Sequence, residues 1–252
     1  MGSLVFAVDF RHPAILAKAS ATLHLISSGR FEFGIGAGYQ PNDYYMTGIP
    51  LDPASIRVER VEEALKIITS MWTQEKTSFS GKHYQVTEIQ RAGELPEGKH
   101  PKIMIGGGGR KMLRLAAQYA DIVGIIPRWR GSFGKMLAHE HTSEGIKRKI
   151  IRVKNAAKDY GRDPDDIEFQ MMSIWTEITE KPEPMFEKLA EYMGVTTDEI
   201  EKSAYMHIGS NSDILDKIQR LREETGINYY VFQLRGDQIE EYAKSIVQPL
   251  TC

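Results

Sequence analysis

The chain has 252 residues, of which 41% are hydrophobic and 26% charged, so it is long enough to bury one large core and has an ordinary globular composition. Its formal net charge of -2 argues against a nucleic-acid-binding surface, which carries a clear basic excess. The one cysteine, Cys252, excludes an internal disulfide, the apolar opening is too short for a signal peptide, and no apolar run approaches the length of a membrane span. We therefore expect a soluble, cytoplasmic protein.

The N-terminal part of the sequence alternates between strand and helix patterns. An apolar run at 4–8 predicts a buried strand, and Pro13 begins a helix that ends at Gly29. The residues expected to face the core from this helix are Ile15, Leu16, Ala19, Leu23 and Ile26. The elements predicted next are a strand over 31–35, an irregular segment over 39–55, a helix over 56–72 and a small hairpin over 77–86.

Four consecutive glycines, Gly106 to Gly109, join a short apolar strand at 103–105 to an amphipathic helix at 112–120. Because glycine has no side chain, the N–H groups of this turn and of the helix N-terminus can approach an anion directly. Arg110 and Lys111 occupy the first helical turn, where the helix dipole favours acids, and a bound phosphate would remove that conflict. The alternative is a flexible turn between strand and helix. We predict a phosphate-binding loop.

The C-terminal part continues the alternation of strands and helices. Its predicted strands cover 122–126, 167–178 and 229–234, and its predicted helices cover 143–160, 184–193, 212–224 and 238–247. The start of the helix at Ser212 offers caps and free amides for an anion. Six strands that alternate with helices predict an α/β fold with a parallel sheet, either a barrel or a doubly wound sheet. In both folds ligands bind at the carboxyl ends of the strands.

Other motifs argue against competing chemistries. The glycines at 34, 36 and 38 suggest a dinucleotide site, but the third glycine is one position early and no helix pattern follows directly. His139-Glu140-His141 is not HExxH and has no cluster of further ligands nearby, so no metal site is predicted. The sequence has no G-x-S-x-G elbow, and Cys252 at the end of the chain is a poor nucleophile.

Four stretches, taken in order, resemble the luciferase-like monooxygenase superfamily: RHPAILAKASATLHLISSGRFEFGIGAGY, RVERVEEALKIITSMW, FSGKHYQV and IGGGGRKMLRLAAQYADIVGI. They look most like its deazaflavin-dependent oxidoreductases, including the methylene-tetrahydromethanopterin reductase-like group. The resemblance covers nearly the whole chain. It implies a TIM-type (β/α) barrel and an oxidoreductase that transfers a hydride to a small organic substrate through coenzyme F-420 (8-hydroxy-5-deazaflavin), with FMN as the alternative.

The resemblance also implies which residues hold the cofactor. The family's phosphate loop corresponds to Gly106, Gly107, Gly108, Gly109 and Arg110, and the loop after its fourth strand corresponds to Gly36, Ala37 and Gly38. A non-prolyl cis peptide bond that presses against the central ring is expected within Ser3-Leu4-Val5. Arg128 and Arg130 match a loop that adds cations near the cofactor tail, which favours the more anionic deazaflavin.

The same alignment begins at the third strand of the family, so about 60 residues that form its first two βα units have no counterpart. We expect one barrel domain over 1–252, N-terminally incomplete, with about six of the eight strands. The catalytic residues stay unknown because the family positions lie in those units. The candidates for catalysis are Asp9, His12 and Tyr39. Asp9 could instead cap a helix or form an ion pair with Arg11, and His12 could instead be a structural residue at the entry to the helix.

Further expectations concern the cavity and the assembly. Tyr44, Tyr45 and Trp175 are additional residues that could face the cavity. Aromatic loop residues such as Tyr44 and Tyr45 more often anchor a loop to the core, and Trp175 is better explained as a core residue. Because an open sheet of six strands leaves apolar edges exposed, we expect a homo-oligomer such as a dimer. The alternative function is a non-catalytic barrel remnant or assembly subunit that retains an anion-binding site.

Overall fold

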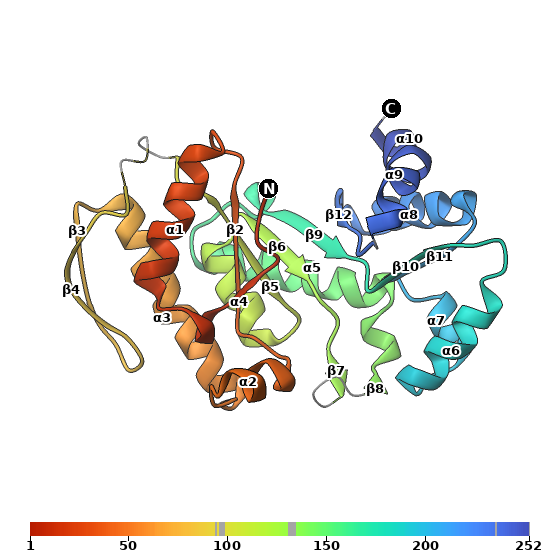
Figure 1. Cartoon of the computed structure of the whole chain (residues 1–252), viewed down its shortest axis with the longest axis horizontal. Coiled ribbons are helices and arrows are strands. Elements are labelled where there is room, and N and C mark those ends of the chain that lie inside the picture. The colour runs from red at the N-terminus through yellow and green to blue at the C-terminus, as the bar shows by residue number, and fades with distance from the viewer. Residues whose placement is uncertain (94, 96–98, 131–134, 235, 252) are drawn as a thin grey trace. The chain divides into compact units, whose positions relative to one another are not determined.

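The computed structural model describes residues 1–93, 95, 99–130, 135–234 and 236–251 (Figure 1). The chain forms two compact units, one of residues 1–123 and 153–167 and the other of residues 124–152 and 168–252. The single domain expected over 1–252 stays a prediction. No helix within the described ranges is both long and apolar enough to cross a membrane.

The parallel sheet confirms the predicted α/β class, and the strands assigned to it among the described residues number six. Neighbouring strands follow the order β1 (Phe6–Ala7), β2 (Glu32–Gly36), β5 (Lys102–Gly107) and β6 (Ile122–Ile125). In the second unit, β9 (Glu168–Met172) pairs in parallel with β12 (Tyr229–Val231). The buried side chains of β2, β5 and β6 form continuous apolar runs, as strands covered on both faces do.

Strand β1 is shorter than the sequence predicts. The Ser3 side chain donates to Gly34 O at 3.0 Å and accepts from Gly34 N at 2.9 Å, so it takes the place of ladder bonds before β1 begins. After Ala7 the chain turns into a single 3-10 turn, Val8–Phe10. The expectation of a fully buried strand was wrong for Leu4, which is 44% exposed.

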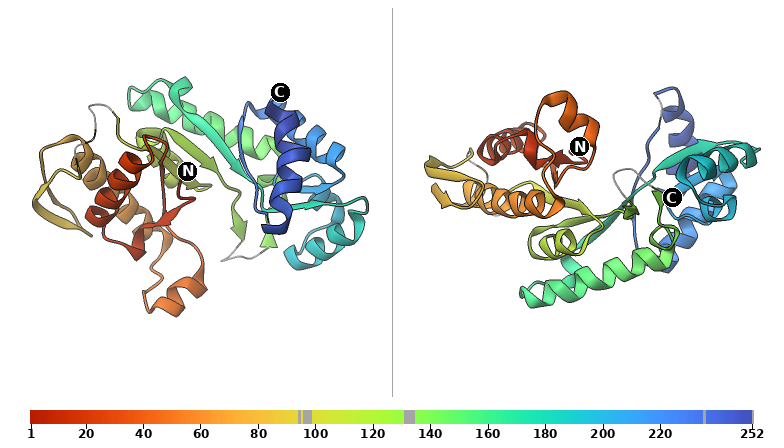
Figure 2. Two further views of the ribbon diagram at one scale, coloured as in Figure 1. Left: turned by 45° about the horizontal axis from the view of Figure 1, so that its top comes forward. Right: turned by 90° about the horizontal axis from the view of Figure 1, so that it is seen from below.

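Helices α1 (Pro13–Ile26) and α3 (Ala54–Thr73) lie side by side in the first unit (Figures 1 and 2). The predicted inward face of α1 was wrong for Ile15 and Ile26, which are 62% and 74% exposed, and for Ala19, which is also exposed, whereas Ala17 and Ala21 are fully buried. Small side chains let the two helices approach closely, and the indole N–H of Trp72 donates to Ala17 O at 2.9 Å. The face of α1 that packs on α3 is therefore determined by how closely the two helices can approach, and not by hydrophobicity alone.

The segment predicted to be irregular over 39–55 contains a helix, α2 (Pro41–Thr47). Pro41 begins this helix and Gly48 ends it in the left-handed conformation, with φ at 70°. The predicted hairpin is confirmed as β3 (Lys76–Ser80) and β4 (Gln85–Gln90), which pair antiparallel. The remaining helices of 110–160 are α4 (Arg110–Tyr119) and α5 (Ser143–Asp159), as predicted.

The strand predicted over 167–178 is divided in the second unit. Ser173 N still donates to Val231 O of β12, but Ile174 N donates to Tyr205 O, so the chain changes its partner at this point. The following strand β10 (Trp175–Ile178) pairs in parallel with β11 (Met206–Gly209). The other elements of this unit are β7 (Trp129–Arg130), β8 (Lys135–Met136), α6 (Glu183–Met193), α7 (Thr197–Glu201), α8 (Asn211–Thr225), α9 (Ile239–Tyr242) and α10 (Gln248–Thr251).

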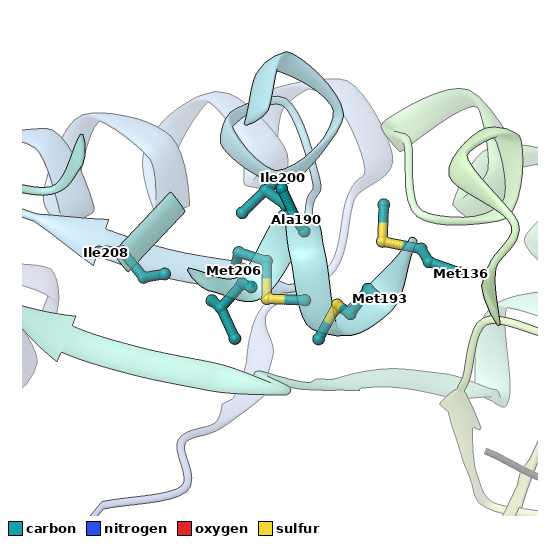
Figure 3. Close-up of a cluster of buried hydrophobic side chains, with 7 residues drawn as sticks. Met136, Ala190, Met193, Ile200, Met206 and Ile208 are labelled. Carbon is teal, nitrogen blue, oxygen red and sulfur yellow. The ribbon is translucent and has the colours of Figure 1, made fainter. Parts of the chain in front are cut away.

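The second unit has its own apolar cores. One gathers Met136, Met193, Met206 and Ile208 from β8, α6 and β11 (Figure 3). Flexible methionine side chains fill irregular gaps where a short helix pair meets a two-stranded sheet. A second cluster packs α8 against the C-terminal helical segment, which runs continuously from α9 to α10 (Figure 2).

Candidate functional site

Three strand ends of the first unit meet at one edge of its sheet. Ala7 of β1 lies opposite Gly36 of β2, and Ile35 of β2 lies opposite Ile105 of β5. The loops that follow these strands therefore leave the sheet at neighbouring points. They carry Asp9, Gly36 to Gly38 and Gly106 to Gly109, which are the residues that the sequence singles out. The structure brings these predicted positions together.

The Leu4–Val5 peptide bond is cis, and it lies within the three residues where the resemblance placed such a bond. A Cβ on Gly36 would stand 2.8 Å from Val5 Cγ2, and a Cβ on Gly34 would overlap the Ser3 carbonyl oxygen. The first two glycines of this series, Gly34 and Gly36, thus allow Ser3 and Val5 to pack closely against β2. This account of the glycines requires no dinucleotide.

The start of α4 is open in the way a phosphate-binding loop requires. Its N-cap residue Gly109 has no side-chain cap, and the first helical turn holds no acid. A Cβ added to Gly109 would meet no atom within 4 Å, and the Arg110 and Lys111 side chains are exposed. No side chain caps the N–H groups at this helix end, where the positive end of the helix dipole also lies.

The start of α8 differs from the expectation of free amides for an anion. Ser210 caps this helix by accepting from Asp213 N at 3.3 Å, and Asp213 Oδ2 accepts from Ser210 N at 2.9 Å. This reciprocal capping box occupies the amides internally. The predicted caps are thus confirmed, whereas the expectation of free amides was wrong for Ser210 N and Asp213 N, because Asp213 and Ser210 bond to them within the box.

Asp9 is buried, with only 1% of its side chain exposed, and both of its oxygens have partners. Tyr44 Oη donates to Asp9 Oδ2 at 2.8 Å, and Arg60 Nη1 donates to Asp9 Oδ1 at 3.1 Å. Burial, followed by the bond to Asp9, raises the pKa of Tyr44 to about 12. The ion pair predicted as the alternative role of Asp9 exists, but its partner is Arg60, not Arg11.

Two arginines of α3 hold the loop after β2. Arg57 Nη1 donates to Ala37 O at 2.9 Å and also to Gly38 O, while its Nε donates to Asp52 O at 2.9 Å. Arg60 joins Asp9 to Asp52. Sequence reasoning missed both arginines. The only signal was two basic residues three positions apart at the start of a helix, which is typical of any solvated helix face.

The same helix anchors the β3–β4 hairpin. Glu63 accepts from the backbone N–H groups of Lys82, His83 and Tyr84 at 2.7, 2.9 and 3.0 Å. Although burial opposes ionisation, these amides lower the pKa of Glu63. The contact gives a physical reason why the helix motif and the hairpin motif of the sequence occur together.

The other candidates differ in their surroundings. His12 caps α1, and its Nδ1 accepts from Ala14 N at 3.3 Å, which is the helix-entry role. Tyr39 and Tyr45 are 65% and 87% exposed. Trp175 is 36% exposed and its indole N–H donates to Glu177 at 3.3 Å, so its assignment to the core was wrong.

Arg128 belongs to the second unit and is already bound to an acid. Its Nε and Nη2 donate to Glu140 Oε1 at 2.9 and 2.6 Å, and Lys149 Nζ lies 2.6 Å from Glu140 Oε2. Burial raises the pKa of Glu140, but the bonds to Arg128 and Lys149 outweigh it and lower the pKa to about 2. The side chain of Arg130 lies outside the described part of the chain.

The neighbouring histidine, His141, lies between aromatic rings, with Ser203 Oγ 3.5 Å from its Nδ1. His141 is fully buried, with Trp129 and Tyr205 packed edge-on against its ring. Burial lowers the pKa of His141 to about 4, so the ring is neutral at pH 7. Within the described ranges no three His, Cys, Asp or Glu side chains are placed to share a metal ion.

Comparison with known proteins places these features in context. Pyrimidine monooxygenase RutA of Allorhizobium ampelinum is 29% identical over 153 residues, which are 60% of this chain and 39% of that protein. An F420-dependent glucose-6-phosphate dehydrogenase of Amycolatopsis mediterranei is 30% identical over 122 residues, which are 48% of this chain and 36% of that protein. The chain thus matches about two fifths or less of the length of these curated relatives.

Solved structures share the fold over the whole chain. An F420-dependent secondary alcohol dehydrogenase in complex with an F420-acetone adduct has a TM-score of 0.76 at 20% identity and covers 100% of this chain and 79% of its own. The coenzyme F420 dependent tetrahydromethanopterin reductase from Methanopyrus kandleri also has a TM-score of 0.76, at 16% identity, covering 99% of this chain and 82% of its own. The α/β fold therefore matches the TIM-barrel type of luciferase-like structures. The profile of the luciferase-like monooxygenases matches residues 1–229, and the chain belongs to that family.

Proposed function

We propose that this protein is an oxidoreductase that transfers a hydride to a small organic substrate through coenzyme F-420, with FMN as the alternative cofactor. The observation that carries the proposal is the uncapped start of α4 behind a run of glycines, at the same sheet edge as Gly36 to Gly38. Family membership and the F420-dependent relatives support the reaction class. A bound deazaflavin or flavin would supply the hydride chemistry.

The chain's own residues would then bind and orient the cofactor. The amides of Gly106 to Gly109 and of Arg110 would hold its phosphate, because the N-cap residue Gly109 has no side-chain cap and the first turn of α4 has no acid. Ser3, Leu4 and Val5 would support the ring from the segment before β1, and Ala37 and Gly38 would border it. Arg57 fixes those last two residues by bonding to their carbonyl oxygens, so it would act as a positioning residue.

The choice between coenzyme F-420 and FMN rests on the anionic tail of the deazaflavin. Arg128 and Arg130 would contact the anionic deazaflavin tail, and Arg128 is held in one geometry by its two bonds to Glu140. That carboxylate also offsets part of the charge of Arg128. Coenzyme F-420 stays the first choice because both cofactors offer a phosphate to the loop, but only the deazaflavin has further anionic groups for these arginines.

We propose Tyr39 as the catalytic candidate for contact with a substrate. It follows Gly38 directly and is 65% exposed. A Tyr39→Phe variant should lose turnover while keeping cofactor affinity. Equal turnover in the variant and the wild type would remove Tyr39 from the proposal.

The second candidate function is a non-catalytic barrel subunit that keeps an anion site. It is favoured by the structural bonds that the carboxylate of Asp9 and Nδ1 of His12 hold. Turnover by the 252-residue chain alone would refute it.

We also propose that the protein forms a homo-oligomer, such as a dimer. Ile15, Leu25 and Ile26 of α1 are 62%, 45% and 74% exposed, and a partner chain could cover these apolar side chains. Light scattering should give at least twice the mass of one chain. A monodisperse monomer with normal thermal stability would contradict the proposal.

The proposed function is tested by titrating the purified chain with coenzyme F-420 and with FMN, and by repeating both titrations on Gly108→Asp. The aspartate adds bulk and a negative charge within the loop, so saturable binding should be lost. Absence of saturable binding of either cofactor to the folded wild type would refute the proposed function.

A further inference from the structure

A pocket of about 240 Å³ lies in the second unit, and no residue of the glycine loop is part of its lining. Its lining includes Ser143, Lys202, Lys217, Arg220, Leu221 and Glu224. Lys202 precedes β11, and Arg220 and Glu224 lie in the last half of α8. The pocket therefore sits at the amino end of β11, whereas the loops that would hold the cofactor follow the carboxyl ends of strands.

Cations outnumber acids in the lining of this pocket, which holds Lys202, Lys217 and Arg220 with one carboxylate, that of Glu224. Outside the lining, Asp198 pairs with Lys202 at 2.6 Å, and the charge of Glu201 acts on Lys217. Because Asp198 offsets the charge of Lys202, Lys217 and Arg220 are the cations of the lining that an anion in the pocket would contact.

Lys217 is the most constrained of the three cations. Its Nζ donates to Glu201 O at 2.8 Å and to Met206 O at 2.7 Å, which fixes the ammonium group between α7 and β11. An ammonium nitrogen carries three donors, so one remains for a ligand after these two bonds. Arg220 lies one helical turn further along α8, adjacent to Lys217 on the same helix face.

We propose that this pocket binds the phosphate group of a small phosphorylated metabolite, with Lys217 and Arg220 as its principal cationic contacts. The Ser143 hydroxyl offers a neutral donor, and Leu221 offers an apolar wall for the carbon skeleton. The volume lies just below the range of about 300–1,000 Å³ that is usual for drug-sized ligands, which suits a metabolite of a few carbons. The site is independent of the cofactor proposed above.

Titration calorimetry with inorganic phosphate and with glycerol 3-phosphate tests the proposal. The wild type should bind glycerol 3-phosphate saturably, and Arg220→Gln should weaken that binding about tenfold because a charge-assisted bond is lost. Arg222→Gln is the matched control: Arg222 is on the same helix, outside the pocket, and bonds to Asn228 at 3.4 Å. Equal affinities in the two variants, or no saturable heat with either ligand, would overturn the proposal.

Two further comparisons separate this pocket from the glycine loop. Gly108→Asp should leave the affinity for glycerol 3-phosphate unchanged, and Arg220→Gln should leave the affinities for coenzyme F-420 and FMN unchanged. Loss of glycerol 3-phosphate binding in Gly108→Asp would assign the phosphate to the glycine loop and overturn the pocket assignment. Failure of the cofactor titrations alone would bear only on the proposed function.

Proton uptake gives an independent readout of Lys217. Burial, followed by the charge of Arg220, lowers the pKa of Lys217 to about 8, while Glu201 acts in the opposite direction. Lys202 and Glu224 also face it across the pocket. A bound anion raises the pKa of Lys217, so binding at pH 8 should take up about half a proton per site.

Sulfate is the probe for this measurement because it does not titrate near pH 8. Heats of sulfate binding in Tris and in HEPES differ by the proton uptake multiplied by the difference in buffer ionisation enthalpy. The wild type should show uptake and Lys217→Met none. Binding without proton uptake would show that Lys217 is not part of the site. If Lys217→Met folds poorly, Arg220→Gln is the second variant of this test.

Discussion

Replacing Tyr44 by Phe isolates the buried bond that ties the loop after β2 to Asp9. The hydroxyl donates to Asp9 at 2.8 Å and the side chain is 1% exposed, while the ring packs against Phe10 with 5.0 Å between centroids. The substitution keeps the ring and removes the hydroxyl. A hydrogen bond to a charged group contributes about 1.5–3 kcal/mol, and Asp9 retains Arg60, so we expect the free energy of unfolding to fall by about 2 kcal/mol.

Urea unfolding followed by circular dichroism measures this change. For a chain of this length, a loss of 2 kcal/mol lowers the melting temperature by about 4–8 °C. Tyr45→Phe is the matched control, because Tyr45 is the adjacent residue and is 87% exposed. It should change stability by less than about 0.5 kcal/mol. Equal stabilities of the two variants would refute the reasoning.

The pH dependence of the same variant supplies a second check. The pKa of Tyr44 is about 12 in the folded protein and about 10 in the unfolded chain. Its raised pKa therefore stabilises the fold fully below pH 10, and this contribution is lost as the pH rises toward 12. The stability difference between wild type and Tyr44→Phe should shrink over that range. A difference that is constant from pH 8 to 12 would contradict the assigned bond.

Gly38→Ala should lower the free energy of unfolding by about 3 kcal/mol in urea unfolding, because φ is 68° and a Cβ would overlap the Tyr44 hydroxyl. Gly48→Ala is the control, since φ is 70° there and no atom lies within 4 Å of the added Cβ. It should lower the free energy of unfolding by only about 1 kcal/mol. Equal costs would show that contact with Tyr44 is unimportant. Glu140→Gln should lower the free energy of unfolding by about 3 kcal/mol, because it leaves the buried ammonium group of Lys149, 6% exposed, without its carboxylate partner. The double variant with Lys149→Met should regain part of that stability. The pKa of Glu140 is about 2 in the folded protein and about 4.3 in the unfolded chain. Its ionised carboxylate therefore stabilises the fold above about pH 4.3, and this stabilisation is lost as the pH falls toward 2. The acid-induced loss of stability between about pH 4.3 and 2 should accordingly be smaller in Glu140→Gln than in the wild type.

The fold was predictable where the periodicity of the sequence was strong. The long helix α3 and the strand-to-helix unit at 102–119 match their predicted positions because apolar spacing and glycine punctuation agree there. The inward face of α1 was not predictable from hydrophobicity, because contact with α3 selects Ala17 and Ala21 over Ile15. The break at Ser173 depends on which strands lie beside it, and a single sequence does not contain that information.

The candidate site shows the same division. Local motifs placed the glycine loops, and the resemblance placed the cis bond within Ser3 to Val5. The pairing of Asp9 with Arg60 joins residues 51 positions apart, and it requires the packing of α3 on the strand ends. Local spacing therefore predicts a ligand loop, whereas the charges that hold the loop in place follow from tertiary structure.

The central claim is that the start of α4 holds the cofactor phosphate, and Gly109→Asp tests it most directly. Gly109 has the N-cap conformation, with φ at -84° and ψ at 151°, and open space for a side chain. An aspartate there should cap the helix and keep or raise stability, while its carboxylate occupies the amides that the phosphate needs. Gly109→Ala, which adds bulk without charge, is the control.

Calorimetric titration of these proteins with coenzyme F-420 and with FMN is the deciding measurement. The account predicts saturable binding to the wild type, a small change in Gly109→Ala, and a loss of at least about tenfold in Gly109→Asp while its thermal stability is retained. Unchanged affinity in a stable Gly109→Asp protein would contradict the claim that this helix start binds the phosphate.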